Sequence, residues 1–247
     1  MTAAATTSQL AALRDEPVQR YARVIALLIL LSAVFGGLGE SYIPAKIIVS
    51  GDAAATANNI ATSPMLFRLG FAAYLVEAVC DVALALLFYV LLRPAGQHLA
   101  LLTAFLGLIS TALYAVAEAF YFAPTIILSG ADYLKAFSPE QLSSLSLFCL
   151  QLFGRIAGLF LGLYGLATVI RGYLIYRSGY LPRTIGALFV IGGAAFILET
   201  LATILAPKYT SPLLLMPIGI AGISLMLWLF VKGVDVERWK TAVAANN

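Results

Sequence analysis

Residues 74–88 read YLVEAVCDVALALLF, an apolar segment interrupted by two acidic residues, Glu77 and Asp81. The flanks of this segment are apolar enough for the interior of a bilayer. Because the two acids are four residues apart, a helix places them one above the other on the same face. The segment therefore predicts a membrane-spanning helix with one polar face, which needs a polar surface from neighbouring helices.

The composition of the whole chain places it among membrane proteins. Of 247 residues, 62% are hydrophobic and 11% are charged, against roughly 45–50% and about 25% in soluble domains. Crossing a bilayer takes about 20 apolar residues, and the chain has runs of this kind at 21–43, 65–92, 99–123, 141–171, 183–206 and 212–232. The sequence predicts an all-α fold, a polytopic membrane helix bundle with six transmembrane helices.

Polar segments mark the boundaries of these runs. The sequence SPEQ at 138–141 is typical of a helix N-cap followed by proline, so the fourth helix is expected to start there. Asp52 is expected to cap a short helix over AAATANNIA, lying at the membrane surface. We expect a polar N-terminal segment (1–19), a membrane domain (20–233) and a C-terminal tail (234–247).

The distribution of lysine and arginine predicts the orientation of the chain. Basic residues concentrate on the cytoplasmic side of membrane proteins. The side that carries both termini holds Arg14, Arg20, Arg23, Arg93, Arg171, Arg177, Arg183, Lys232, Arg238 and Lys240, whereas the other holds Lys46, Lys135 and Lys208. Both termini are therefore predicted to be cytoplasmic, in a multi-pass membrane protein. The first run is longer than the core of a cleaved signal peptide and is interpreted as a retained anchor.

Charged residues also occur inside the other predicted spans. The third holds Glu118, the fourth Arg155 and the fifth Glu199, while Glu40 and Arg68 fall near the outer boundary. A charge at mid-bilayer costs about 2.5–3.5 kcal/mol on insertion scales, so such residues usually face a partner or a wet cavity. The intramembrane charges are therefore expected to meet one another inside the bundle.

The balance of these charges predicts a network centred on Arg155. Four intramembrane acids, Glu77 and Asp81 among them, share this one central arginine, which suits bidentate pairing with a carboxylate. Desolvation and crowding of like charges favour the neutral form of the remaining acids. Helical stripes of polar residues add further side chains, and the predicted ligand-binding set is Glu77, Asp81, Glu118, Arg155, Glu199, Tyr74, Tyr114 and Gln151.

The sequence lacks the residues that several kinds of functional site require. His98 is the sole histidine, so a multi-histidine zinc site is excluded, and no metal or other cofactor is predicted. The small net charge of +3 is scattered, which argues against nucleic acid as a partner. Cys80 and Cys149 lie in apolar runs and are interpreted as core residues. Gly154, Gly158 and Gly162 form a small-residue face expected to allow close helix packing.

Three stretches of the sequence resemble a known family. They are VSGDAAATANNIATSPMLFRLG (49–70), DVALALLFYVLLRP (81–94) and GYLIYRSGYLPRTIGAL (172–188), with LWLFVKG (227–233) closing the match. The chain is similar in these stretches to a family of bacterial membrane proteins catalogued as domain of unknown function 4386. The resemblance implies a six-helix bundle with no established activity and, with the predicted orientation, a place in the bacterial inner membrane.

Three functions from different classes fit these observations. The first is a protein that binds or moves a small amphipathic or lipid-like molecule in a polar pocket of the bundle. The second is an intramembrane enzyme that uses a neutral carboxyl as a general acid on a lipid or isoprenoid. The third is a structural or regulatory partner of another membrane protein. The expected partners are membrane lipids, a small hydrophobic ligand, and a second copy or another membrane protein.

Overall fold

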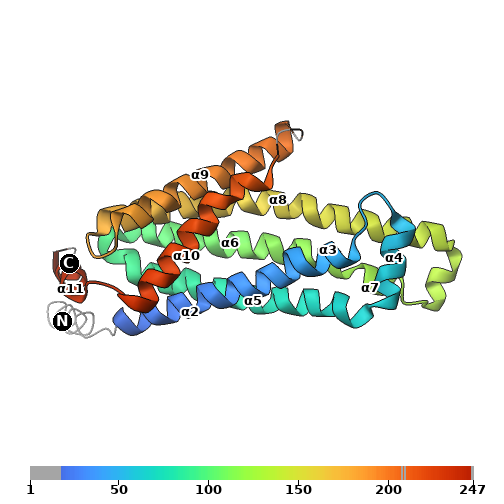
Figure 1. The fold of residues 1–247 in the computed structure, drawn as a ribbon, viewed down its shortest axis with the longest axis horizontal. Helices are drawn as coiled ribbons and strands as arrows, with labels where there is room; N and C mark the ends of the chain where they lie inside the picture. Colours follow the sequence, from blue (N-terminus) through green and yellow to red (C-terminus); the bar gives the residue numbers. More distant parts are fainter. Residues whose placement is uncertain (1–17, 207, 209, 246–247) are drawn as a thin grey trace, which may run out of the picture. The chain divides into compact units, whose positions relative to one another are not determined.

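The computed structural model describes residues 18–206, 208 and 210–245, and these residues form helices and connecting turns without a strand (Figure 1). In chain order the elements are α2 (Val18–Gly36), the π-helix η1 (Gly37–Tyr42), α3 (Ile43–Ile47), α4 (Ala53–Thr62), α5 (Pro64–Leu92), η2 (Arg93–Ala95), α6 (Gln97–Phe122), α7 (Pro124–Ile127), η3 (Asp132–Ala136), α8 (Pro139–Ser178), α9 (Arg183–Leu205), η5 (Pro212–Leu215), α10 (Met216–Val231) and α11 (Val236–Ala245). The predicted all-α class is confirmed.

The long helices coincide with the predicted apolar runs. Five are long and apolar enough to cross a membrane, namely Val18–Ile47, Pro64–Ala95, Gln97–Ile127, Pro139–Ser178 and Arg183–Leu205. The sixth run forms α10, whose 16 residues are fewer than the roughly 20 that a span needs. It is long enough for a membrane span only when it is taken together with α11, and the axes of these two helices differ by 104°. The architecture is compatible with a multi-pass membrane protein with five or six crossings.

Both predicted helix starts are present. The Asp52 carboxylate accepts a hydrogen bond of 2.8 Å from the backbone N–H of Ala55, which caps α4. At the start of α8, the Ser138 hydroxyl accepts from the Gln141 N–H, and the Gln141 side chain accepts from the Ser138 N–H at 2.8 Å. This reciprocal pair is a capping box, which satisfies two backbone donors that the first turn of a helix otherwise leaves unpaired.

The first long helix changes its winding near its end. A π-helical segment, GLGESY at 37–42, separates α2 from α3, and Pro44 follows in the first turn of α3. Proline lacks an N–H, and its ring clashes with the carbonyl four residues earlier in a regular α-helix. The wider π turn relieves this conflict, so the helix continues through the proline. The predicted end of the first run at 43 therefore moves to Ile47.

The chain divides into two compact units, each with its own apolar core. Unit 1 comprises 1–30, 82–109 and 161–247, and unit 2 comprises 31–81 and 110–160. Among the described residues, the core of unit 1 draws on α2, α5, α6, α8, α9, α10 and α11. The core of unit 2 is smaller and includes Phe67 stacked on Tyr121, with ring centroids 4.7 Å apart.

Glycines bring α8 and α9 into backbone contact inside unit 1. A Cβ on Gly172 would lie 2.7 Å from the carbonyl oxygen of Gly186, and one on Gly193 would lie 2.6 Å from that of Gly165. Only residues without a side chain allow this approach. The predicted small-residue face is placed differently. Its Gly162 packs against the Thr200 side chain, but Gly154 faces open space, so the prediction is wrong for Gly154.

Side chains near both ends of the described chain meet in unit 1. The Gln19 amide donates to the Lys232 carbonyl and accepts from the Val234 N–H, which joins the start of α2 to the segment after α10 (Figure 1). The carbonyl of Leu91, near the end of α5, accepts from the Tyr180 hydroxyl at 2.8 Å and from the Trp239 indole at 3.1 Å. The predicted C-terminal tail therefore contains a helix, α11, whose Trp239 belongs to the core.

Candidate functional site: an acid and tyrosine cluster in unit 2

Three helical segments of unit 2 bring acids and tyrosines together. The π-helix η1 contributes Glu40, α5 contributes Tyr74, Glu77 and Asp81, and α6 contributes Tyr114, Glu118 and Tyr121. We name these seven side chains the acid–tyrosine cluster. The spacing of its members on α5 and α6 is three or four residues, so each helix presents its polar side chains on a single face.

The carboxyls of the cluster lie close enough to interact electrostatically, and two of them accept hydrogen bonds from hydroxyls. The Glu77 carboxyl lies within electrostatic range of those of Glu40, Asp81 and Glu118. The Tyr114 hydroxyl donates a hydrogen bond to the Glu40 carboxyl, and the Ser32 hydroxyl donates to the Asp81 carboxyl at 3.1 Å. The two acids of the opening segment, Glu77 and Asp81, thus lie near further acids of η1 and α6, and the Glu40 side chain among these is partly open to the surface.

Several polar atoms of the cluster are buried without a hydrogen-bond partner. Glu118 is 4% exposed, Tyr74 2% and Tyr121 1%. One carboxyl oxygen of Glu118 and of Glu77, and the hydroxyls of Tyr74 and Tyr121, have no hydrogen-bond partner in the part of the chain that the structure describes. An unsatisfied buried polar group costs about 1–3 kcal/mol, so four of them in one place are a strong reason to expect a ligand, a proton or water.

Two glycines provide the space that the cluster occupies. A Cβ on Gly36 would lie 2.5 Å from a carboxyl oxygen of Glu77, and one on Gly70 would lie 2.6 Å from the Tyr121 hydroxyl. Gly39 also brings the first helix close to α5, since its Cβ would lie 3.0 Å from the Gly70 carbonyl. The close approach of these helices depends on glycine, and it sets the distance between the acids.

Aromatic rings surround the acids. The Tyr114 ring lies 4.9 Å from that of Tyr74 and 4.8 Å from that of Phe160, measured between centroids. The Phe153 ring lies 5.4 Å from that of Tyr121. These rings present π faces and hydroxyls toward the same region, which suits a cation or a hydrogen-bond donor attached to an apolar body.

Three of the predicted ligand-binding residues lie outside the cluster. Arg155 does not hold the central position predicted for it, because its side chain is exposed and forms no ion pair in the described part of unit 2. Gln151 is also exposed. Glu199 belongs to unit 1, where its carboxyl accepts from the Ser211 N–H at 3.4 Å. The fourth helix is rotated so that apolar rings, and not its polar stripe, meet the acids.

Sequence reasoning assigned Glu40 to the outer boundary and left it out of the predicted set. Glu40 lies within the π-helical segment, where the wider turn changes the direction in which side chains project from that of a regular α-helix. The signal that was available is the pair of glycines in GLGESY, which is followed closely by a proline. Arg68, in contrast, is exposed on α5, in agreement with its predicted surface position.

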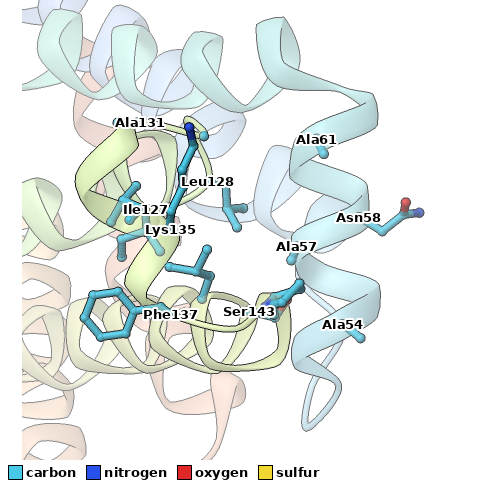
Figure 2. A pocket seen from close by; sticks show the side chains of 14 residues that line it. Ala54, Ala57, Asn58, Ala61, Ile127, Leu128, Ala131, Lys135, Phe137 and Ser143 are labelled. Carbon is cyan, nitrogen blue, oxygen red and sulfur yellow. The ribbon is translucent and has the colours of Figure 1, made fainter.

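A separate groove lies on unit 2, away from the predicted residues. It has a volume of about 410 Å³ and is lined by residues of α4 and by the segment from α7 to the start of α8. Figure 2 shows α4 along one side, with Ala54, Ala57 and Ala61, and Lys135 and Phe137 among the residues on the other. Its lining is mostly apolar, and Lys135 forms an exposed ion pair with Asp132 at 2.6 Å.

Among the described residues, no group of three or more histidine, cysteine, aspartate or glutamate side chains is arranged to hold a metal ion. Cys80 and Cys149 are both buried and free, in agreement with their predicted place in the core. The four carboxyls are thus near one another without forming a coordination shell.

The sequence model of the family described as "Domain of unknown function (DUF4386)" matches residues 24–233, so the chain belongs to this family. This confirms the resemblance found in the sequence. No match was found among curated proteins or among solved structures.

Proposed function

We propose that this member of the DUF4386 family binds or moves a small amphipathic molecule, whose polar end is held by the acid–tyrosine cluster. The observation that carries the proposal is the burial of the Glu118 carboxyl with the Tyr74 and Tyr121 hydroxyls: one oxygen of that carboxyl and both hydroxyls have no hydrogen-bond partner among the described residues. Buried polar groups are nearly always hydrogen-bonded in folded proteins. A ligand is the simplest group that satisfies all three together.

The chemistry of the cluster favours a polar end that donates hydrogen bonds, such as an amine or a hydroxyl. Carboxylates accept hydrogen bonds and attract cations, and tyrosine rings bind cations through their π faces. Arg155 lies outside the cluster, so a carboxylate or phosphate would meet only like charge there. The apolar body of such a ligand would lie among Tyr114, Phe153 and Phe160.

Proton coupling is a natural part of this proposal. The Glu77 carboxyl has three other carboxyls within electrostatic range, so a bound cation and bound protons would compete for the same group of oxygens. Arrival of a cationic ligand would release a proton from the cluster, and its departure would restore it. Glu77 and Asp81 are the groups that we assign to this exchange, because they adjoin on one helix face.

The membrane and its orientation complete the proposal. The helices are long and apolar enough for several crossings, and the excess of arginine and lysine supports cytoplasmic termini in a bacterial inner membrane. Arg171 is left out of this count of basic residues, because it lies inside α8 and not in a loop. The bias toward the same side persists without it.

Native mass spectrometry of the full-length protein, released from mild detergent, tests the proposal. We expect a small molecule bound to the parent protein and lost from Glu118→Gln and Tyr74→Phe. Glu199→Gln is the matched control, since it neutralises an acid outside the cluster, and its ligand should be retained. A protein that carries no small molecule, or that carries the same one in all variants, would contradict the assignment.

An acid-catalysed enzyme is a second candidate, which one observation favours. The Glu118 carboxyl lies in an aromatic surround, and a buried carboxyl of this kind can protonate an alkene while aromatic faces stabilise the cation formed. Incubation with a prenyl lipid distinguishes the two functions. A product that Glu118→Gln abolishes indicates an enzyme, whereas unchanged lipid that stays bound indicates a carrier.

A further inference from the structure

Among its described residues, unit 1 buries one arginine, which forms no ion pair with a described acid of that unit. Arg171 lies on α8 and is 5% exposed, and its Nε–H has no hydrogen-bond partner. The guanidinium stacks on the Phe88 ring, 4.4 Å from its centroid, and lies 5.8 Å from that of Tyr164. Arginine cannot lose its charge in a protein, so this position holds a full positive charge in an apolar setting.

The described acids of unit 1 are engaged elsewhere or exposed. Glu199 accepts from the Ser211 N–H, Asp235 pairs with Arg238 at 3.2 Å, and Glu237 is exposed on α11. The cation–π contact with Phe88 compensates for only part of the lost hydration of a guanidinium. Arg171 is therefore a buried cation for which the described acids of unit 1 provide no counter-charge.

The position of Arg171 along its helix suggests where that anion comes from. It lies seven residues before the end of α8 at Ser178, or about 10 Å along the axis. The last turns of α8 carry exposed Tyr173 and Tyr176, and Arg183 lies over the Tyr176 ring. Exposed tyrosines with arginines are typical of the level of lipid headgroups. The guanidinium thus lies just inside that level.

We propose that Arg171 binds an oxyanion, a phosphate or carboxylate group, that reaches it from the adjoining membrane surface. A planar guanidinium pairs with both oxygens of such a group, and Arg is the residue best suited to this recognition. Phe88 fixes the plane of the guanidinium. This site lies in unit 1 and is separate from the acid–tyrosine cluster, so it stands or falls independently of the proposed function.

The test uses the full-length protein in phosphatidylcholine nanodiscs that contain a minor fraction of phosphatidylglycerol, with retained lipid counted by native mass spectrometry. We expect Arg171→Gln to lower phosphatidylglycerol retention by about tenfold or more. Arg177→Gln, which removes an exposed charge from the same helix, should leave it unchanged. Equal retention in the parent protein and in Arg171→Gln would overturn the proposal.

Two further arms complete the experiment. Arg171→Lys keeps the charge but loses the planar guanidinium, so we expect retention to fall by about threefold. If Arg171→Gln fails to fold, this variant decides, and retention equal to that of the parent overturns the proposal. Inorganic phosphate distinguishes the source of the anion. Release of phosphatidylglycerol by phosphate indicates a site for free anions, and its persistence indicates a lipid headgroup.

Discussion

Glu118 and Arg171 are the two buried charged residues in the described part of the chain, and they belong to different units. Unit 2 collects four acids and three tyrosines, and its arginines, Arg68 and Arg155, are exposed. Unit 1 buries an arginine, and its acids are engaged elsewhere or exposed. The sequence led us to expect that such charges neutralise one another. Under the two proposals, each unit is completed from outside, unit 2 by a hydrogen-bond donor or cation and unit 1 by an oxyanion.

The two units also differ in how their helices approach. In unit 1, glycines of α8 and α9 allow backbone to touch backbone. In unit 2, glycines make room for polar side chains, because Gly36 adjoins the Glu77 carboxyl and Gly70 the Tyr121 hydroxyl. The same residue type therefore serves tight packing in one unit and a polar site in the other. Replacing single glycines by alanine in each unit distinguishes the packing role from the role in the polar site.

The largest effect is expected from Gly186→Ala in unit 1. Its Cβ would lie 2.5 Å from the Tyr176 backbone nitrogen, which cannot move aside as a side chain can. We expect the free energy of unfolding to fall by about 3 kcal/mol, measured by thermal unfolding in detergent. Gly154→Ala is the control, because its Cβ meets nothing within 4 Å, and it should be neutral or slightly stabilising. Equal midpoints would contradict the packing described for α8 and α9.

Trp239→Phe tests how firmly α11 is tied to unit 1. The indole is fully buried and donates to the Leu91 carbonyl, so its loss removes both a hydrogen bond and part of a packed ring. A decrease in stability of about 2 kcal/mol is expected, with faster proteolysis of the C-terminal segment. Trp228→Phe alters a partly exposed indole and should change proteolysis little. If both variants resist protease as the parent does, α11 is not held by this bond.

Gly36→Ala tests the polar site of unit 2, with a smaller expected loss of stability than the two substitutions in unit 1. The added methyl group displaces the flexible Glu77 carboxyl, so we expect a loss of about 1 kcal/mol in stability and weaker retention of the small molecule. Gly37→Ala is the matched control on the next residue, where a Cβ meets nothing within 4 Å. Ligand retention that is the same in both variants would show that the Glu77 carboxyl does not take part in binding.

The smallest effect is expected from Ser138→Ala, which removes the cap of α8 in unit 2. Loss of an N-cap hydroxyl costs about 1 kcal/mol, and the change should be confined to the first turn. Hydrogen exchange of the amides near Gln141 measures it. Ser143→Ala, whose hydroxyl bonds only to the Pro139 carbonyl within the helix, serves as the control. Protection that is equal in the two variants would rule out a role for the capping box.

The sequence by itself determined where the helices lie. The apolar runs have the length that a bilayer requires, and caps and prolines bound them, so 65–92 and 183–206 agree with α5 and α9 to within a residue. It also predicted that Glu77, Asp81 and Glu118 share a polar interior with Tyr74 and Tyr114. Their spacing on each helix fixes which side chains point the same way.

Only the tertiary structure decided which faces meet. A polar stripe fixes one face of a helix, but nothing local states how that helix is rotated against its neighbours. Arg155 and Gln151 form such a stripe and remain exposed, whereas Arg171, assigned to a loop, is buried because α8 continues to Ser178. Glu40 joins the cluster because it lies in the π-helical segment, whose wider turn changes the direction in which its side chain projects. Helical length and polarity are local properties, but the rotation of each helix is set by packing between distant parts of the chain.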